Sequence, residues 1–149
     1  MQVQQNNPHV TFNLYAAVLV FTCGRQTKRG DWMMTANLID ETLNEDPITI
    51  VMFCKERASL PNLSRTGDIL RMHRVYVNEW KGDIQLSGRR PSSYVVIRKP
   101  EDDEWKVIPS ATGTFFFSNQ DEEKSQKLWH WTQHFVRQYP TIKAEHSYK

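Results

Sequence analysis

Two histidines near the C-terminus are the first candidates for chemistry, because they lie four residues apart. His130 and His134 would share one face of a helix, the spacing used by the zinc-binding motif His-Glu-x-x-His. The residues between them are Trp-Thr-Gln, so the glutamate of that motif is missing. The sequence also contains no glycine-rich phosphate loop and no Gly-x-Ser-x-Gly nucleophile. We therefore expect no enzyme, no metal site, no cofactor and no small-molecule substrate.

The cysteines and the apolar runs narrow the class of protein further. Cys23 and Cys54 form neither a Cys-x-x-Cys pair nor a metal cluster, which is typical of reduced thiols in an intracellular protein. No apolar run approaches the ~18 residues that a transmembrane helix needs. The first seven residues, Met-Gln-Val-Gln-Gln-Asn-Asn, lack the basic region and apolar core of a signal peptide. We expect an intracellular protein without a membrane partner.

The net charge of +2 hides an uneven distribution. The two acidic segments, residues 101–104 and 121–123, hold seven of the seventeen acidic residues, so the rest of the chain carries nineteen basic and ten acidic residues. A basic body with acidic segments set apart can bind a polyanion through one face. A soluble surface with solvated charges explains the same numbers equally well, so charge alone decides nothing.

Strand-like segments, rich in β-branched and aromatic residues, occupy the first two-thirds of the chain. They span residues 12–21, 32–39, 48–53, 69–80, 84–87 and 93–97. A polar, basic hairpin loop lies at 22–31, and 55–60 has room for one or two helical turns. The imperfect alternation in 69–80 indicates a β-bulge. About five strands with a short helix after the third favour a mainly β fold, a single OB-fold with a five-stranded Greek-key barrel; an SH3-like barrel is the alternative.

The last third of the chain has a different pattern. Residues 100–110 are expected to form a charged loop around Trp105. A helix should follow, with Asn119 as its N-cap and Glu122 completing a capping box. Its apolar stripe, which Pro140 ends, consists of Leu128, Trp131, Phe135 and Tyr139. We expect this C-terminal α-helix to pack on the barrel and to hold its acidic first turn away from any bound polyanion.

These patterns divide the chain into four parts. We expect an N-terminal tail at 1–11, the barrel at 12–99, an acidic loop and helix at 100–140, and a C-terminal tail at 141–149.

The segment Leu60-Pro-Asn-Leu-Ser-Arg-Thr-Gly-Asp-Ile-Leu-Arg-Met-His-Arg74 resembles the signature of the protection-of-telomeres and telomere end-binding protein alpha family. That family carries Leu-Pro, a short spacer and Gly-Asp-Ile-(apolar)-Arg-x-His-Arg in an N-terminal OB-fold. Residues 14–18 resemble its first strand, and 38–42 its Val-Asp-x-Thr turn. The resemblance covers residues 12–98. It implies a nuclear protein at chromosome ends that binds single-stranded G-rich telomeric DNA and contributes to telomere protection and length control, with other telomere proteins as candidate partners.

The same resemblance implies which residues contact DNA. Phe53 and Trp80 match the family's aromatic residues, on which unstacked bases can lie. Arg74 matches an arginine that can read a guanine edge or bridge a phosphate, and His73 is expected to orient the barrel or pack beneath the ligand. Gln85 can offer a donor and an acceptor to a base edge. Core packing is the alternative for both aromatics, and simple solvation for the polar residues.

Cations in two loops complete the expected DNA-binding set. Four residues of the first hairpin loop are expected to close over the strand: Arg25, Lys28, Arg29 and Asp31. Lys81, the cation beside Trp80, is expected to contact the DNA as well. The segment 89–92, Arg-Arg-Pro-Ser, can extend the basic track. Two other functions stay open at this point, an OB-fold that joins proteins within a telomere complex and a general binder of single-stranded DNA or RNA.

Overall fold

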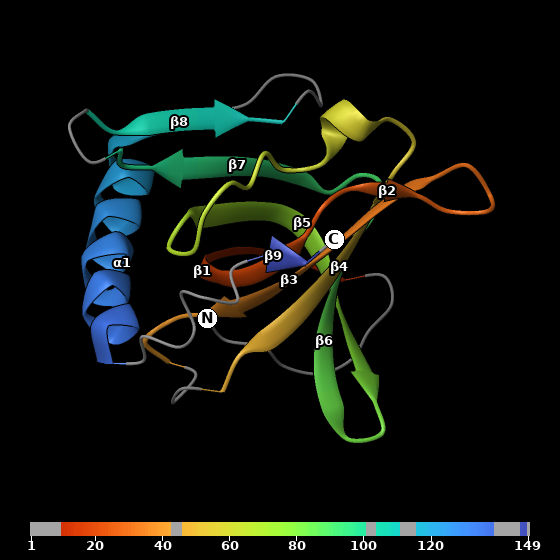
Figure 1. Cartoon of the computed structure of the whole chain (residues 1–149), viewed down its shortest axis with the longest axis horizontal. Helices are drawn as coiled ribbons and strands as arrows, with labels where there is room; N and C mark the ends of the chain where they lie inside the picture. The colour runs from red at the N-terminus through yellow and green to blue at the C-terminus, as the bar shows by residue number, and fades with distance from the viewer. Residues whose placement is uncertain (1–9, 43–45, 101–103, 111–115, 139–146, 149) are drawn as a thin grey trace.

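The computed structural model describes residues 10–42, 46–100, 104–110, 116–138 and 147–148 (Figure 1). The side chains of residues 80, 137, 138, 147 and 148 lie outside that description. The elements in chain order are β1 (Thr11–Thr22), β2 (Arg25–Gln26), β3 (Trp32–Ile39), β4 (Ile48–Cys54), the 3₁₀ turn η1 (Arg57–Ser59), β5 (Ile69–Trp80), β6 (Asp83–Gly88), β7 (Ser93–Arg98), β8 (Lys106–Pro109), α1 (Asn119–Gln138) and β9 (Ser147–Tyr148).

Five of these strands close into a barrel. Strand β1 pairs antiparallel with β3 on one edge and with β5 on the other. Strand β4 pairs antiparallel with β3 and parallel with β6, and β6 returns antiparallel to β5. The ring β1-β3-β4-β6-β5-β1 is therefore a small Greek-key barrel with a turn of 3₁₀ helix after its third strand. The fold is an OB-fold, as the strand pattern indicated.

Strand β5 carries the bulge that its irregular alternation predicted. Arg74 adopts a left-handed φ of 58°, and the pairing with β1 shifts register between Phe12 and Leu14. The side-chain oxygen of Asn13 accepts a hydrogen bond from the Arg74 backbone N–H at 3.0 Å, so the bulged amide is satisfied. The bulge bends β5, which then pairs along one edge with β7 before the bulge and with β6 after it.

One expectation for the segment after the barrel is wrong. Residues 100–110 were expected to form a charged loop, but Lys106–Pro109 is the edge strand β8, which pairs antiparallel with β7. Within it, Val107 packs against the cluster beneath the helix and Ile108 against the barrel interior. A four-residue strand depends on the partner edge that it joins, and the local sequence does not disclose that partner.

The apolar residues form two cores on the two sides of the barrel wall. The barrel interior is filled by alternate residues of the five strands, among them Val18, Leu38, Ile50, Met52, Leu70, Met72 and Leu86. A second cluster lies between the outside of β1, β5 and β7 and the helix α1. Leu128 and Phe135 are buried there and Trp131 is half-buried, so these members of the stripe are core as expected; Tyr139 lies outside the described residues. None of the described helices is long and apolar enough to cross a membrane.

Helix α1 begins one residue earlier than its capping pattern suggested, with Ser118 as the N-cap in place of Asn119. Ser118 Oγ accepts a hydrogen bond from the Asp121 N–H at 3.2 Å, and the Asp121 carboxylate accepts one from the Ser118 N–H at 2.7 Å. Serine and asparagine are about equally good caps, so local preference could not choose between them. Tertiary contacts decide the start, because Asp121 is also held by the barrel.

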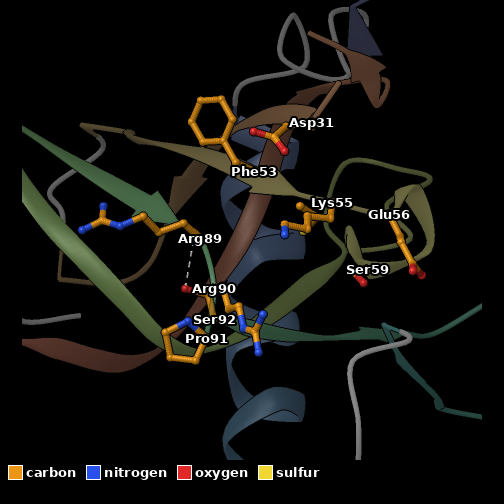
Figure 2. A pocket seen from close by; sticks show the side chains of 10 residues that line it. Asp31, Phe53, Lys55, Glu56, Ser59, Arg89, Arg90, Pro91 and Ser92 are labelled. Carbon is orange, nitrogen blue, oxygen red and sulfur yellow. Dashed lines mark hydrogen bonds between the residues drawn. The ribbon is translucent and has the colours of Figure 1, made fainter. Parts of the chain in front are cut away.

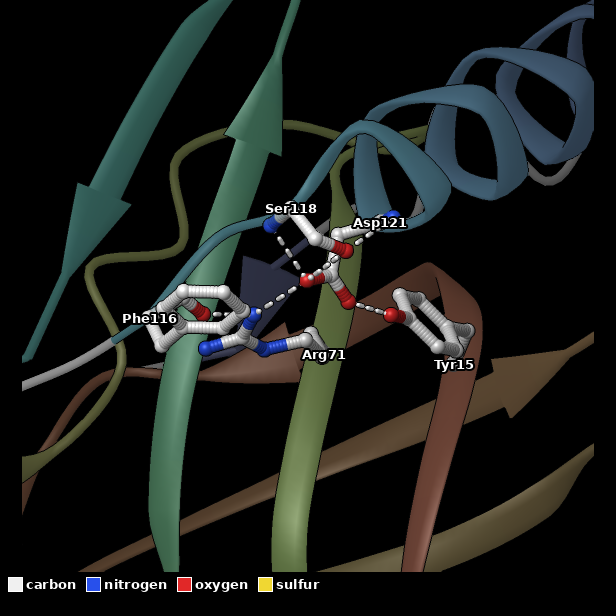
Figure 3. Close-up of polar contacts among 5 residues, drawn as sticks. All are labelled: Tyr15, Arg71, Phe116, Ser118 and Asp121. Atoms are coloured by element: carbon white, nitrogen blue, oxygen red, sulfur yellow. Dashed lines mark hydrogen bonds and ion pairs between the residues drawn. The ribbon is translucent and has the colours of Figure 1, made fainter.

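The barrel contact of Asp121 fixes the helix to β1 and β5 (Figure 3). Its carboxylate lies 3.2 Å from the guanidinium of Arg71, whose side chain is only 3% exposed, and it accepts a hydrogen bond from the Tyr15 hydroxyl. Arg71 also donates to the Phe116 carbonyl. A buried guanidinium needs such partners, because an unpaired buried charge is costly.

Several residues of the signature between positions 60 and 74 have structural roles. Gly67 has a φ of 98°, a conformation that favours glycine. The Asp68 carboxylate is buried, forms two hydrogen bonds at 2.9 Å with the Arg98 guanidinium, and accepts the Ser64 N–H. Leu60 and Leu63 fill the barrel interior. These residues are therefore accounted for by packing and loop geometry.

Candidate nucleic-acid interface

The outer face of β3, β4 and β6 is a different part of the barrel wall from β1 and β5, which the helix contacts (Figure 1). Because Met34, Ile50 and Leu86 point into the barrel, the residues between them point outward. Strand register arranges these outward side chains in two rows: Asn37, Thr49, Gln85 and Asn78 in one, and Thr35, Val51, Ser87 and Tyr76 in the other. The first row carries hydroxyl and amide groups, which can donate to and accept from base edges.

A groove of about 530 Å³ opens at one end of this face (Figure 2). It lies between the end of β4 and the turn that joins β6 to β7. Its lining consists of Asp31, Phe53, Cys54, Lys55, Glu56, Ser59, Arg89, Arg90, Pro91 and Ser92. Phe53 is 37% exposed and its ring stands at the rim, so it is a surface aromatic with a free face. An exposed ring with cations beside it is what single-stranded nucleic acid binds.

The β6–β7 turn is fixed to the barrel through Ser92. Its backbone N–H donates to the Arg89 carbonyl at 2.7 Å, and its hydroxyl accepts the Arg89 N–H at 3.1 Å. The same hydroxyl donates to the carbonyl of Arg74 at 2.6 Å. The bulge in β5 therefore positions the turn, and Arg74 itself lies exposed beside the groove without lining it.

The hairpin that contains β2 borders the other side of the groove. Arg25 pairs with Met33, which in turn pairs with Phe53, so this hairpin lies next to the exposed ring. Hydrogen bonds from Thr27 N to the Asp31 carbonyl, at 2.7 Å, and within the loop hold its tip in shape. The loop cations Arg25, Lys28 and Arg29 are exposed, whereas Asp31 is half-buried at the groove.

The β5–β6 hairpin ends in a tight two-residue turn. Lys81 and Gly82 both have positive φ, 50° and 84°, as a type I′ turn requires. The backbone of Trp80 pairs with Asp83 at the end of β5, and the Trp80 side chain lies outside the described part of the structure. Among the described side chains, Lys81 does not line the groove, whereas Gln85 occupies the first outward row.

His73 is separated from the groove. Alternation along β5 places it on the same side as Ile69, which packs beneath the helix. Burial lowers the pKa of His73, and the positive charges of Arg71 and Arg74 lower it further. A neutral imidazole there suits a role in supporting the barrel, while its role in DNA binding stays a prediction.

The sequence interpretation missed some residues of this face. Lys55 follows β4 directly, two residues after Phe53, and a cation so close to a candidate stacking ring could have been predicted from the sequence. Tyr76 was hidden, because the bulge at Arg74 changes which residues of β5 point outward. Among the described residues no cluster of three or more His, Cys, Asp or Glu is placed to hold a metal ion.

The barrel and this groove place the protein in the OB-fold class, whose corresponding strands bind oligonucleotides or oligosaccharides; the exposed ring and cations favour an oligonucleotide. The sequence pattern of the family described as "Telomeric single stranded DNA binding POT1/CDC13" matches residues 1–142. The chain belongs to this family.

Individual relatives agree with this membership. The chain is 26% identical over 113 residues to Protection of telomeres protein 1 of Gallus gallus, and 24% over 120 residues to that of Homo sapiens. These alignments cover 76% and 80% of the chain but only 14% and 18% of the relatives, so it spans less than a fifth of their length.

Two solved structures share the fold. One is a Pot1 (protection of telomere)–ssDNA complex, with a TM-score of 0.75 at 20% identity over 88% of this chain and 81% of the other. The second, of fission yeast Pot1 and ssDNA, gives a TM-score of 0.74 at 20% identity over 91% of this chain and 46% of the other. The family and these neighbours are DNA-binding proteins.

Proposed function

We propose that this domain binds the single-stranded, G-rich telomeric DNA of chromosome ends in the groove around Phe53 and across the outward face of β3, β4 and β6. As a nuclear, non-enzymatic protein it contributes to telomere protection and length control. The observation that carries this proposal is the exposed Phe53 ring at the rim of a groove with Lys55 and Arg90 in its lining. Membership of a telomeric single-stranded-DNA-binding family supports it.

Each part of the face has a separate task in this proposal. Bases stack on Phe53 and on Trp80 at the end of β5, because every base has a π-face that an aromatic ring can contact. Base edges meet the outward row that contains Gln85. Lys28 and Arg29 of the hairpin follow the phosphates as the strand leaves the groove.

The helix serves as a support on the far side of the barrel. Figure 1 shows α1 at one end of the molecule and the β2 and β5–β6 hairpins at the other. The acidic first turn of α1 is held to the outside of β1 and β5 by the contact of Asp121 with Arg71. Its negative charge therefore does not face the groove, where it would repel phosphates. We further propose that residues 12–99 bind DNA and that residues 100–140 brace them.

Titration with labelled oligonucleotides of equal length tests the proposal. The set contains a G-rich telomeric single strand, its C-rich complement, the duplex, a scrambled strand and the G-rich sequence as RNA. We expect the G-rich single strand to bind most tightly. Equal affinity for the G-rich, scrambled and duplex DNA would refute the telomeric assignment. Preference for the C-rich strand would show that the domain binds the opposite telomeric strand. Equal binding of RNA would make the domain a general single-strand binder, and no binding at all would favour a protein-interaction role.

A further inference from the structure

A second flat surface lies beside the Phe53 groove, and it is made by an arginine resting on a tyrosine. The Arg89 guanidinium carbon lies 3.8 Å from the centre of the Tyr76 ring, and one of its nitrogens lies 3.4 Å from Ser87 Oγ. This is the shortest cation–ring distance among the described residues. Figure 2 shows the Arg89 side chain pointing away from Lys55 and Arg90.

The barrel holds both halves of this pair in place. Tyr76 pairs with Ser87 across the β5–β6 ladder. The Arg89 side chain reaches back to Ser87 and so lies over the Tyr76 ring. The backbone of Arg89 is anchored by its hydrogen bonds with Ser92. Arg89 is exposed, so the guanidinium that lies over the ring can also be reached from solvent. A planar cation in a fixed position is preorganised to stack.

The position of the pair matches the path of a strand that stacks on Phe53. Met52 pairs with Gly88 at the end of the parallel β4–β6 ladder; Phe53 is the next residue of β4, and Arg89 is the first residue after β6. Neighbouring strands lie about 4.8 Å apart, so adjacent nucleotides of one strand can reach both residues. Unstacked bases lie on arginine planes as well as on aromatic rings.

We propose that Arg89, held flat on Tyr76, is a stacking platform for one nucleobase of the bound strand, next to the base on Phe53. This inference rests on the proposed function. It assigns Arg89 a role in base stacking, which depends on its planar shape, in place of a phosphate contact, which would depend on charge alone. Tyr76 is the positioning residue, because it orients the guanidinium.

The test compares Arg89→Ala and Arg89→Lys with the wild-type protein on a G-rich telomeric single strand of about a dozen nucleotides, within the site size of an OB-fold. Each base is replaced in turn by an abasic linker that keeps every phosphate. Losing one stacked base should weaken wild-type binding by about 5- to 160-fold. Arg89→Ala should cause a loss of that size, and one linker position should then cause no further loss. Arg89→Lys keeps the charge but not the planar group. The abasic linker at the same position should therefore cause no further loss of affinity, while the salt dependence of binding stays as in wild type.

Two further variants complete the experiment. Tyr76→Leu removes the ring beneath the guanidinium and should weaken binding in the same direction at the same linker position. Arg65→Ala is the matched control, because Arg65 is an exposed arginine in a different hollow, near the helix residues Trp129 and Gln133. It removes the same charge and should leave the linker profile unchanged.

The outcomes separate this inference from the function on which it rests. If wild-type protein fails to bind the strand, the proposed function is refuted and the platform with it. If wild type binds and Arg89→Lys retains full affinity while Arg89→Ala only flattens the salt dependence, Arg89 is a phosphate contact and the platform is refuted. Full affinity of Arg89→Ala with an unchanged linker profile would also refute it.

Discussion

The substitution Phe53→Ala tests whether the groove binds bases, because Phe53 is the exposed ring on which the site assignment depends. If a base stacks on this ring, the substitution should weaken binding by ~1–3 kcal/mol. The folding cost should be smaller than for a core phenylalanine, for which ~3–5 kcal/mol is typical. Fluorescence titration and a thermal melt of the same preparation measure the two effects.

The folding cost follows from the exposure of the ring. A wholly enclosed aromatic side chain buries on the order of 150–250 Å². Phe53 leaves 37% exposed, so it buries roughly 120 Å², of which alanine would keep about half. Losing about 60 Å² at ~25 cal/mol per Å² costs about 1.5 kcal/mol. No closed cavity forms, because the ring already faces solvent.

The preceding residue is a matched control. Met52 is fully buried and points into the barrel, so Met52→Ala should cost ~2–5 kcal/mol of stability. At a temperature where both proteins are folded, its DNA affinity should stay close to that of wild type. A Phe53→Ala protein that melts like wild type and binds with undiminished affinity would remove Phe53 from the site. A folding loss as large as that of Met52→Ala would show that the ring is core.

Four other outcomes are expected. Trp80→Ala should weaken binding by ~1–3 kcal/mol with little change in melting temperature; a loss of ~3–5 kcal/mol of stability would show core packing instead. The logarithm of affinity should fall with the logarithm of salt by ~0.7 per phosphate contacted, and Arg29→Ala should flatten this slope, whereas salt-independent binding contradicts the basic-loop interpretation. The pKa of His73 is lowered on folding, so the unfolded state binds more protons than the folded state. The free energy of unfolding should therefore fall as the pH drops through about 6.5, the ordinary histidine pKa. Urea melts should show that this fall is smaller in His73→Gln. Asp121→Asn leaves the buried Arg71 charge without its carboxylate and should cost ~3–5 kcal/mol in the same melts, and a wild-type midpoint would refute that role.

Strand identity could be predicted from sequence wherever side-chain alternation is local. The segments 32–39 and 69–80 coincide with β3 and β5, because β-branched and aromatic residues favour a half-buried pleated surface. The Gly-Asp-Ile signature could also be recognised from the sequence, because it encodes local structure. Gly67 and Asp68 form a local turn whose geometry demands those residue types.

The groove depended on contacts between segments distant in sequence. Phe53 could be named as a candidate, but its exposure depends on which face of β4 turns outward, and the barrel decides that. Tyr76 and Arg89 meet only because the bulge at Arg74 resets β5 and Ser92 anchors the following turn. No pattern within either segment carries that information.

The sequence by itself determined that this chain forms a barrel of about five strands with an amphipathic helix, because local alternation and periodicity encode which residues are buried. Tertiary structure alone decided where the helix begins and which outward residues share a groove. Ser118 and Asn119 are nearly equal caps, and the contact of Asp121 with Arg71 accompanies the choice of Ser118. The local alternatives differ little in free energy. Contacts between segments that are distant in sequence contribute enough energy to decide between them.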